Sequence, residues 1–316
     1  MNTKKVLVTG AAGFIGFHTA TRLLRENLDV IALDNLSRGS RRKLELLEKM
    51  GAETLVGDIR DRNLICRVLR DCDAIVHLAA LISVEESFEV PDEYVDVNTR
   101  GTAVIARCCA ENNVDRIVYA STAAVYGEPK ELPVKEDHPL DPLSPYGVSK
   151  LAGEQVLLLI AEKSDISCIV LRLFNVYGPG QDPGSPYSGV ITRFVVRALK
   201  GEPLIVYGDG FQTRDFVYVE DVVEAIMLSL RKKITGVFNI GSGKPTSILE
   251  LAEQIGLVLG RQPRIIHAPP RPGDIRYSYA CLDKAGEKLG FQPKIQLREG
   301  LEKLITSITE KREEHA

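Results

Sequence analysis

The 316-residue sequence lacks an excess of charge of one sign and an apolar run of membrane-spanning length. Its formal net charge is −3, so no broad surplus of lysine and arginine is present to neutralise the phosphates of a nucleic acid. No apolar run approaches the roughly 20 residues of a transmembrane helix. The apolar segment at residues 6–8 is too short for the core of a signal peptide. We expect a cytoplasmic protein without nucleic-acid or membrane partners.

Cys-x-x-Cys pairs are also missing. The irregular spacing and the lack of a Cys-x-x-Cys pattern exclude a zinc ribbon and argue against a disulfide framework. The six cysteines are Cys66, Cys72, Cys108, Cys109, Cys168 and Cys281. Cysteines of a cytoplasmic protein are usually reduced, so we expect buried thiols and no metal site.

What the sequence contains is an alternation of short β-branched segments with amphipathic helical ones. The expected strands are Val6–Val8, Val30–Leu33, Glu53–Val56, Ala74–Leu78, Arg116–Ala120 and Ile166–Leu171. The expected helices include His18–Glu26, Leu64–Leu69, Val97–Glu111 and Lys150–Lys163. This alternation implies βαβ crossovers and a parallel sheet covered on both faces. We predict an α/β fold with a doubly wound, Rossmann-type parallel sheet.

The length exceeds that of one usual domain, so we expect a large domain and a smaller α/β domain. Proline and glycine become dense from Pro179 onward, and we place the boundary between residues 1–172 and 173–316. Phe216–Val219 and Val237–Ile240 are expected to return to the main sheet. The end of the chain, Leu301–Ala316, is expected to form a charged helix.

A glycine-rich segment, Gly10-Ala-Ala-Gly13-Phe14-Ile15-Gly16, follows the first expected strand and opens a helix. Glycines allow a tight turn and a close approach of the backbone to a pyrophosphate, which then lies at the positive end of the helix. The spacing Gly-x-x-Gly-x-x-Gly differs from the commoner Gly-x-Gly-x-x-Gly. Its place between strand and helix predicts a dinucleotide site.

Asp34 ends the second expected strand, where a carboxylate accepts hydrogen bonds from the ribose hydroxyls and disfavours a 2′-phosphate. This residue favours NAD over NADP, although Arg38 nearby could hold that phosphate. Asp58 follows the third strand and could meet the adenine amino group or cap a turn. Leu78, Ala79 and Ala80 end the fourth strand, and Ser121 and Thr122 end the fifth, so all these side chains share one edge of the sheet.

Tyr146 and Lys150, in Tyr-Gly-Val-Ser-Lys, are four residues apart and face the same side of a helix. A tyrosine with a pKa of about 10 is a poor base at neutral pH. A neighbouring ammonium and a positively charged nicotinamide both favour the phenolate and would lower that pKa. Together with Thr122, this pair predicts an enzyme that moves protons beside a nicotinamide.

In order along the chain, these residues resemble the extended short-chain dehydrogenase/reductase family, and specifically its nucleotide-sugar epimerases of the UDP-glucose 4-epimerase kind. The resemblance extends through most of the chain. Beyond the segments above, it is carried by Asp34-Asn-Leu36, His77-Leu-Ala-Ala80, Asn98, Ser121–Gly127, Leu171-Arg-Leu-Phe-Asn175, Tyr207-Gly-Asp-Gly210, Arg214–Val219 and Arg271-Pro-Gly-Asp274.

The resemblance implies an isomerase that holds NAD in residues 1–172 and a UDP-sugar in residues 173–316. Tyr146 would take the proton of the sugar 4-hydroxyl, Thr122 would bind the 4-oxygen, and Lys150 would bind the nicotinamide ribose. Hydride would leave C4 and return to the opposite face, without net redox change. The family usually dimerises, here through Val97–Glu111 and Lys150–Lys163.

The resemblance also implies which residues hold the two ligands. NAD would be bound by Gly10, Gly13, Phe14, Ile15, Gly16, Asp34, Asn35, Ser37, Arg38, Asp58, Ile59, Leu78, Ala79, Ala80, Asn98, Ser121, Tyr146 and Lys150. The UDP-sugar would be bound by Ser83, Thr122, Asn175, Val190, Tyr207, Arg214, Arg271, Asp274 and Ser278, with the arginines on the diphosphate.

Departures from related enzymes narrow the activity. Dehydratases that resemble this chain carry an Asp-Glu pair after the threonine, whereas Ala123 and Ala124 stand here. Asn175 favours a neutral sugar over a uronate. Ser278 falls where related epimerases carry either tyrosine or a small residue beside the C2 substituent, which favours N-acetylated sugars as well.

Several alternatives stay open. Within enzymes, the chain could be a UDP-glucuronate 4-epimerase, a decarboxylase, or a reductase that makes a deoxysugar. From a different class, it could be a nucleotide-sensing protein that has lost catalysis, although such proteins commonly lack the Tyr-x-x-x-Lys pair. The preferred hexose, and whether N-acetyl or uronate sugars are accepted, do not follow from the sequence.

Overall fold

A seven-stranded parallel sheet forms the centre of the computed structural model, which describes residues 3–181, 189–270 and 275–313. The strand order is β10-β6-β5-β4-β1-β2-β3, and every neighbouring pair is parallel. The strands are β1 Lys5–Thr9, β2 Asp29–Asp34, β3 Glu53–Val56, β4 Ala74–His77, β5 Arg116–Thr122, β6 Ser167–Leu173 and β10 Gly236–Ile240. Apart from the edge strand β3, buried β-branched and aliphatic side chains fill these strands, as expected for a sheet covered on both faces. The predicted Rossmann-type α/β fold is confirmed.

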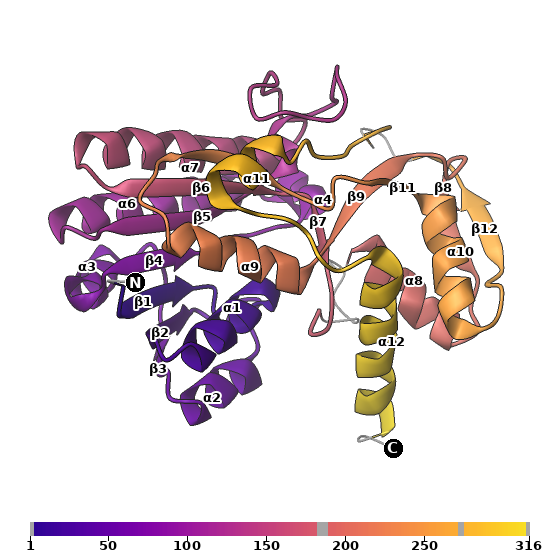
Figure 1. Cartoon of the computed structure of the whole chain (residues 1–316), viewed down its shortest axis with the longest axis horizontal. Helices are drawn as coiled ribbons and strands as arrows, with labels where there is room; N and C mark the ends of the chain where they lie inside the picture. Colours follow the sequence, from indigo (N-terminus) through magenta and orange to yellow (C-terminus); the bar gives the residue numbers. More distant parts are fainter. Residues whose placement is uncertain (1–2, 182–188, 271–274, 314–316) are drawn as a thin grey trace.

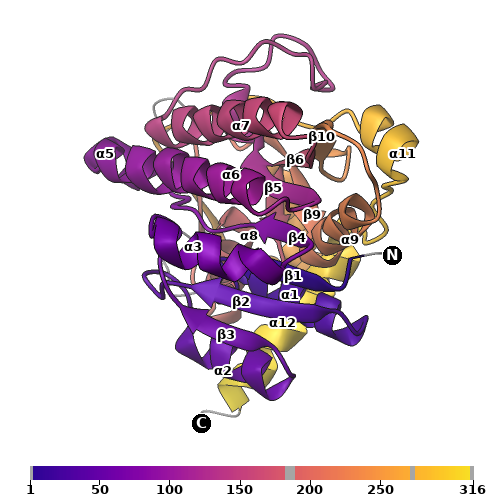
Figure 2. The same ribbon diagram turned by 90° about the vertical axis from the view of Figure 1, so that its left-hand side faces the viewer.

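Helices cover both faces of this sheet (Figure 2). One face packs against α1 Phe14–Arg25, α2 Arg41–Lys49, α9 Val219–Leu230 and α11 Asp283–Leu289. The other packs against α3 Arg62–Val68, α6 Gly101–Glu111 and α7 Pro145–Lys163. Both apolar layers are continuous, so the sheet is held between two cores.

Short helical elements follow β4 and precede α6. These are α4 Val84–Glu89, α5 Pro91–Tyr94 and the π-helical turn η2 Val95–Arg100, with the 3₁₀ turns η1 Leu69–Asp71 and η3 Ala123–Val125 elsewhere in the chain. The predicted helix Val97–Glu111 therefore begins as a π turn that continues into α6. Such turns are frequent at functional sites.

A smaller lobe, on the right of Figure 1, has its own apolar core. It contains a three-stranded sheet β11-β9-β7 and a two-stranded sheet β12-β8. Its elements are β7 Asn175–Tyr177, α8 Val190–Leu199, β8 Leu204–Tyr207, β9 Thr213–Tyr218, β11 Pro245–Ser247, α10 Ile248–Leu259, β12 Ile265–Ala268 and α12 Leu297–Glu313. The charged C-terminal helix expected from the sequence is α12, which starts four residues earlier than predicted.

One of the two predicted returns to the main sheet is confirmed and the other is wrong. Val237–Ile240 lies in β10, which pairs with β6 at the edge of the seven-stranded sheet. Phe216–Val219 instead falls in β9, which pairs with β7 and β11, and in the start of α9. The alternation of apolar residues marks a strand but does not say which sheet it joins. The division at residue 172 stays a prediction.

The cysteines depart from expectation at one pair. α3 and α6 pack against each other, and a disulfide joins Cys66 to Cys108 across them. The expectation of six reduced thiols is therefore wrong for these two. They are 42 residues apart in sequence, and only the packing of two helices brings them together. The remaining four cysteines are free and buried.

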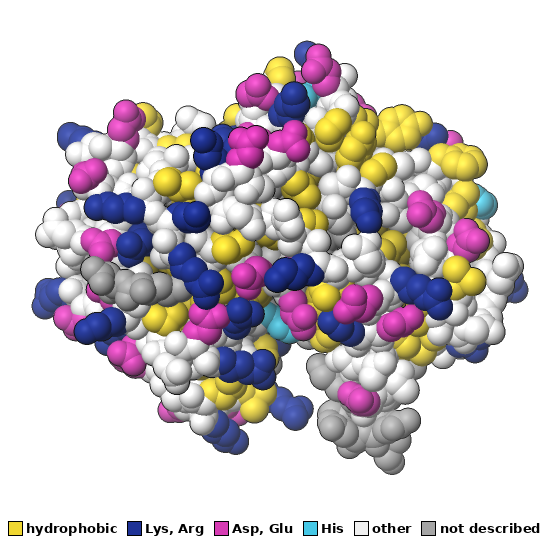
Figure 3. Space-filling view, viewed as in Figure 1, with side chains coloured by type: hydrophobic (Ala, Val, Ile, Leu, Met, Phe, Trp, Pro, Cys, Tyr) yellow, Lys and Arg dark blue, Asp and Glu magenta, His cyan; other side chains and the backbone are white. Residues whose placement is uncertain are grey.

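Charged side chains of both signs are interspersed on the face shown in Figure 3. Over the described part of the chain, no helix combines the length and the apolarity needed to cross a membrane.

Candidate active site

Two glycines around the turn after β1 stand where a side chain would not fit. Gly10 has φ of 70°, and a Cβ there would lie 2.8 Å from the backbone nitrogen of Ala79. A Cβ on Gly16 would lie 2.0 Å from the carbonyl oxygen of Gly10, so only glycine fits where α1 passes the turn. Helix α1 starts after Gly13 without a side-chain cap and without an acidic residue in its first turn. That first turn, which suits a phosphate, contains Phe14, Ile15 and Gly16.

Asp34 ends β2 beside this turn and is 7% exposed. Its two carboxylate oxygens accept hydrogen bonds from the backbone N–H groups of Ala12, at 3.0 Å, and Leu36, at 2.8 Å. Burial raises the pKa of this carboxyl, while those two hydrogen bonds and the charge of Lys43 oppose the rise. The carboxylate is thus fixed next to the glycine turn, where an acid can accept hydrogen bonds from ribose hydroxyls.

The segments after β2 and β3 are tied together by polar side chains. Asn35 donates from Nδ2 to Asp58, at 3.0 Å, and accepts from the N–H and the hydroxyl of Ser37. Arg60 makes two side-chain hydrogen bonds to Asp58 and holds the pKa of that carboxyl well below its usual range. Ile59 is buried between these loops and α6. Asp58 is therefore a fixed anion rather than a loose turn residue.

Arg38, the residue that left NADP open, forms an ion pair with Glu86 of α4. This pairing partly neutralises the guanidinium. It weakens the case for a bound 2′-phosphate and agrees with the carboxylate of Asp34 at the end of β2.

A buried hydrogen-bonded chain lies under the strand ends, and sequence reasoning did not find it. The Thr9 hydroxyl accepts from the N–H groups of residues 78–79, so it must donate its own proton to Nδ1 of His77, at 2.8 Å. His77 is then neutral with its proton on Nε2, which donates to Thr102 at 3.0 Å. Burial holds the pKa of His77 well below its ordinary value. Thr102 completes the chain by donating to the carbonyl of Asn98.

The side chain of Asn98 fixes the segment that follows β4. Its amide accepts from the N–H of Leu81, at 2.8 Å, and donates to the carbonyl of Leu81 and to the Ser149 hydroxyl. These bonds hold the strand end with Leu78, Ala79 and Ala80. Asn98 thus positions the backbone of the segment that follows β4.

The three predicted catalytic side chains come together at the carboxyl edge of the sheet. Tyr146 lies in the first turn of α7, which begins five residues earlier than predicted, and its hydroxyl lies near enough to Thr122, at the end of β5, for Thr122 to affect its pKa. Lys150 lies one turn further along α7 and is 3% exposed. Its Nζ lies 4.0 Å from the centroid of the Tyr119 ring. The Tyr146 ring itself packs edge-on against Tyr94, with the centroids 6.3 Å apart.

In the protein without NAD, the pKa values of Tyr146 and Lys150 differ from what the sequence predicts. Burial raises the pKa of Tyr146, and the interaction with the Thr122 side chain opposes the rise. Burial lowers the pKa of Lys150 to about 7, against the charge of Glu154. In the protein without NAD, Lys150 is not among the groups that shift the pKa of Tyr146, so the expected lowering by this ammonium is not found.

The comparison with known proteins decides the family. The sequence profile of the NAD dependent epimerase/dehydratase family matches residues 6–241, which is most of the chain. The chain belongs to this family. It is thus an NAD-dependent isomerase of the extended short-chain dehydrogenase/reductase type, and the glycine turn, the uncapped α1 and Asp34 fit the dinucleotide.

Relatives within the family extend over nearly the whole chain. A putative UDP-glucose 4-epimerase of Methanocaldococcus jannaschii is 42% identical over 302 residues, or 95% of this chain and 97% of the relative. The crystal structure of the Thermotoga maritima UDP-glucose 4-epimerase with UDP-glucose has a TM-score of 0.93 at 36% identity, covering 98% and 99% of the two chains. The UDP-N-acetylglucosamine 4-epimerase of Methanobrevibacter ruminantium, in complex with UDP-N-acetylmuramic acid, has a TM-score of 0.94 at 35% identity, covering 98% and 100%.

The residues predicted to hold the UDP-sugar are spread over both parts of this epimerase-family fold. Ser83 caps α4, where its hydroxyl accepts from the N–H of Glu86 at 3.1 Å. The others lie on the smaller lobe or at its border: exposed Asn175 at the start of β7, half-buried Val190, Tyr207 and Arg214, and buried Ser278. Arg271 and Asp274 lie outside the described residues.

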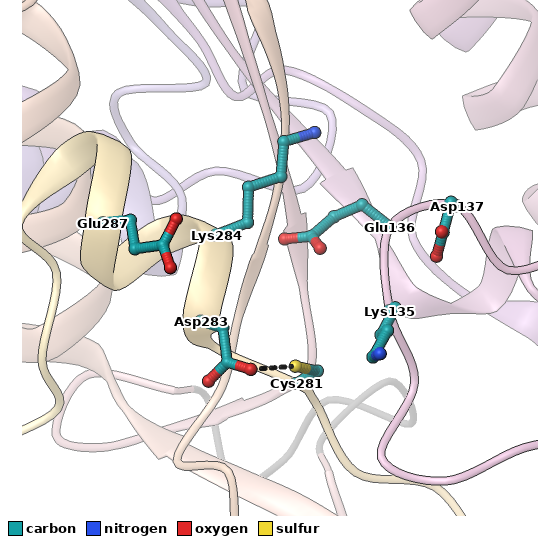
Figure 4. Close-up of a pocket in the computed structure, with 7 residues that line it drawn as sticks. All are labelled: Lys135, Glu136, Asp137, Cys281, Asp283, Lys284 and Glu287. Atoms are coloured by element: carbon teal, nitrogen blue, oxygen red, sulfur yellow. Dashed lines mark hydrogen bonds between the residues drawn. The ribbon is translucent and has the colours of Figure 1, made fainter.

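A cavity of about 340 Å³ lies beside α11 and is lined by charged side chains and Cys281 (Figure 4). The thiol of Cys281 is hydrogen-bonded to Asp283 at 3.4 Å. Of the predicted catalytic and ligand-binding residues that the structure describes, none lines this cavity. It is separate from the carboxyl edge where Tyr146 and Thr122 meet.

Proposed function

We propose that this protein interconverts the C4 epimers of a UDP-hexose, UDP-glucose and UDP-galactose first, with NAD as a catalyst that is regenerated in each turnover. The observation that carries the proposal is the placement of Tyr146 in the first turn of α7, near Thr122 at the end of β5, with the buried Lys150 one turn further along α7. Ala123 and Ala124 follow Thr122, so no acid–base group stands there to expel a 6-hydroxyl. The arrangement supports epimerisation and disfavours dehydration.

In this mechanism Tyr146 accepts the proton of the sugar 4-hydroxyl while Thr122 holds the 4-oxygen. NAD, which the glycine turn and Asp34 would hold, would supply the acceptor and donor of the C4 hydride, and its charged ring would favour the phenolate of Tyr146. Lys150 adds a second positive charge whenever it is protonated. Between the two transfers the 4-keto sugar turns about its diphosphate, and Tyr146 returns the proton.

The diphosphate is proposed to lie between the two lobes, held by Arg214 and Arg271 with Asn175, Val190, Tyr207 and Asp274 around the nucleotide. Guanidinium groups suit this task because their paired donors match phosphate oxygens. Support comes from Arg214 on β9, a strand of the smaller lobe whose neighbour β7 starts at Asn175.

Acceptance of N-acetylated sugars is a second part of the proposal. Ser278 and Ala280 are buried, whereas the Tyr277 side chain is 44% exposed. Alternation along an extended segment therefore turns Ser278, and not Tyr277, towards the interior. The similarity to the M. ruminantium UDP-N-acetylglucosamine 4-epimerase also supports a small residue beside C2.

The proposed homodimer would use the helices α6 and α7, which pack side by side on one face of the sheet. Two aliphatic side chains on α7, Val148 and Leu159, are 50% and 65% exposed. Burial of such side chains in a partner would stabilise an interface. A sedimentation mass of one chain at micromolar concentration would count against the dimer.

A substrate panel tests the proposed specificity. The purified protein is incubated separately with UDP-galactose, UDP-N-acetylgalactosamine and UDP-glucuronate, and NMR identifies the products. We expect the 4-epimers of the first two sugars. Ser278→Tyr should lower turnover of the N-acetyl sugar at least about tenfold relative to UDP-galactose, because an added ring meets the acetamido group. Tyr277→Phe is the control and should leave the ratio unchanged. Turnover of UDP-glucuronate alone would replace this proposal with the uronate epimerase.

A further inference from the structure

Behind the catalytic residues lies a fully buried carboxylate, that of Glu154. It is 0% exposed and accepts hydrogen bonds from the Ser121 hydroxyl and from Nε and Nη2 of Arg172. The Arg172 bonds are 3.1 Å and 2.8 Å long, and Arg172 is itself 3% exposed. Nη1 of Arg172 donates to the Tyr126 hydroxyl and to the carbonyl of Glu136. The ion pair is therefore held on several sides and buried away from water.

The position of this carboxylate in the fold joins three elements of the active site. Glu154 is four residues after Lys150 on α7, so both side chains face the same side of the helix. Ser121 immediately precedes Thr122 on β5, and Arg172 stands opposite Ser121 in the register of β5 and β6. One side chain thus contacts the strand end that carries Thr122 and lies one helical turn from Lys150.

Stability does not explain such a pair. Removing two charges from water costs several kcal/mol for each, and well-packed apolar residues of similar volume are often as stable or more so. A buried ion pair beside a catalytic group suggests instead a role in setting the charge and position of that group.

We propose that Glu154 is a positioning residue of the reaction: it favours the protonated form of Lys150 and, through Ser121, holds the strand end that presents Thr122 to the sugar. This inference rests on the proposed function, because it assigns Lys150 and Thr122 the tasks that 4-epimerisation requires. Glu154 itself touches neither the sugar nor the cofactor.

The surroundings of Lys150 make Glu154 the source of negative charge. On α7 the titratable neighbours are Tyr146 and Glu154; on β5 the Tyr119 ring lies against the ammonium, and on β4 His77 interacts with it. Burial raises the pKa of Tyr119 and of Tyr146, and it lowers that of His77, so all three are neutral near pH 7. Among the described residues around Lys150, the carboxylate of Glu154 is the group that opposes loss of its proton.

The test measures the titration of Lys150 directly. The amine is followed by NMR of ¹³Cε-labelled lysine in the purified protein, and its resonance is assigned by its loss in Lys150→Met. In Glu154→Gln we expect the titration midpoint to fall by about one pH unit, as for the loss of one nearby opposite charge. The alkaline limb of the pH profile of kcat should fall by the same amount while KM stays within about twofold.

Two further variants keep the test decisive. Glu154→Gln leaves a buried guanidinium unpaired, which can cost about 3–5 kcal/mol, so the double variant Glu154→Gln with Arg172→Met removes both charges and should fold. Asp221→Asn is the matched control. Asp221 is a second buried carboxylate, which accepts hydrogen bonds from the backbone N–H groups of Lys294 and Ile295 and contacts none of the predicted catalytic residues. It should leave the Lys150 midpoint unchanged.

The outcomes separate this inference from the proposed function. A Lys150 midpoint within about 0.3 units of wild type in both Glu154 variants would overturn the inference, whichever sugar the protein turns over. A shifted midpoint in a protein that epimerises no UDP-sugar would support the electrostatic role of Glu154 and reject 4-epimerisation.

Discussion

Replacement of Tyr146 by phenylalanine removes one hydroxyl and leaves the rest of the site in place. The hydroxyl lies near Thr122, which affects its pKa, and the ring packs edge-on against Tyr94, a contact that phenylalanine can keep. Loss of the polar interactions of one half-buried hydroxyl should cost about 1 kcal/mol of unfolding free energy. The variant should therefore fold, keep its cofactor and fail only in proton transfer.

The expected loss in kcat is about 10²–10⁴, which is the usual contribution of one general acid–base group and corresponds to about 3–5 kcal/mol of activation free energy. Thr122 cannot replace the phenol, because its hydroxyl is a far weaker acid. The loss should appear in kcat rather than in KM, since the hydroxyl exchanges a proton with the substrate only during reaction.

The assay follows conversion of UDP-galactose to UDP-glucose with a coupled dehydrogenase, and the bound NAD is extracted and quantified. Tyr277→Phe is the control, because Tyr277 is 44% exposed and has no proposed part in proton transfer. A Tyr146→Phe protein with turnover within about threefold of wild type would refute the assignment of the proton-transfer group.

Gly16→Ala should lower the unfolding free energy by at least about 2 kcal/mol and abolish NAD retention, because the added Cβ would lie 2.0 Å from a carbonyl oxygen. Thermal unfolding measures the loss, with Gly286→Ala as the control, since the atom nearest to an added Cβ there is 3.7 Å away. Lys150→Met should remove a pH dependence of the unfolding free energy. The native pKa of Lys150, about 7, lies below its pKa in the unfolded chain, so the wild type gains up to about 1.4 kcal/mol of unfolding free energy per pH unit as the pH rises above 7. Urea unfolding of both proteins at pH 7 and pH 9 measures the difference. Thiol titration in denaturant should give four free thiols before reduction and six after it, and Cys66→Ser with Cys108→Ser should cost about 2–4 kcal/mol; six thiols before reduction would reject the disulfide.

The main sheet could be predicted because buried parallel strands are continuous β-branched runs with glycine turns and helices between them. The carboxyl edge followed from the same order, since parallel strands place their ends together, and Thr122 was thereby brought to Tyr146 across 24 positions of sequence. Helix starts were less accurate. Pro145 and the cap Ser144 begin α7 ahead of its apolar pattern.

What the sequence could not show depends on tertiary packing. The disulfide requires that two helices lie in contact. Strand β9 joins the small sheet, although its apolar residues resemble those of a strand in the main sheet. The pKa of Tyr146 depends on burial, which no local pattern reports. A signal for Glu154 was present, since it follows Lys150 by one helical turn, but its partner Arg172 is in a different strand.

The most direct test of the central claim follows the hydrogen at C4. The purified protein, without added cofactor, is incubated with UDP-galactose deuterated at C4, and the product is examined by NMR. The account predicts UDP-glucose that retains deuterium at C4, because the hydride leaves and returns without exchange with water. UDP-glucose with hydrogen from solvent at C4, or no UDP-glucose even after NAD is supplied, would contradict it.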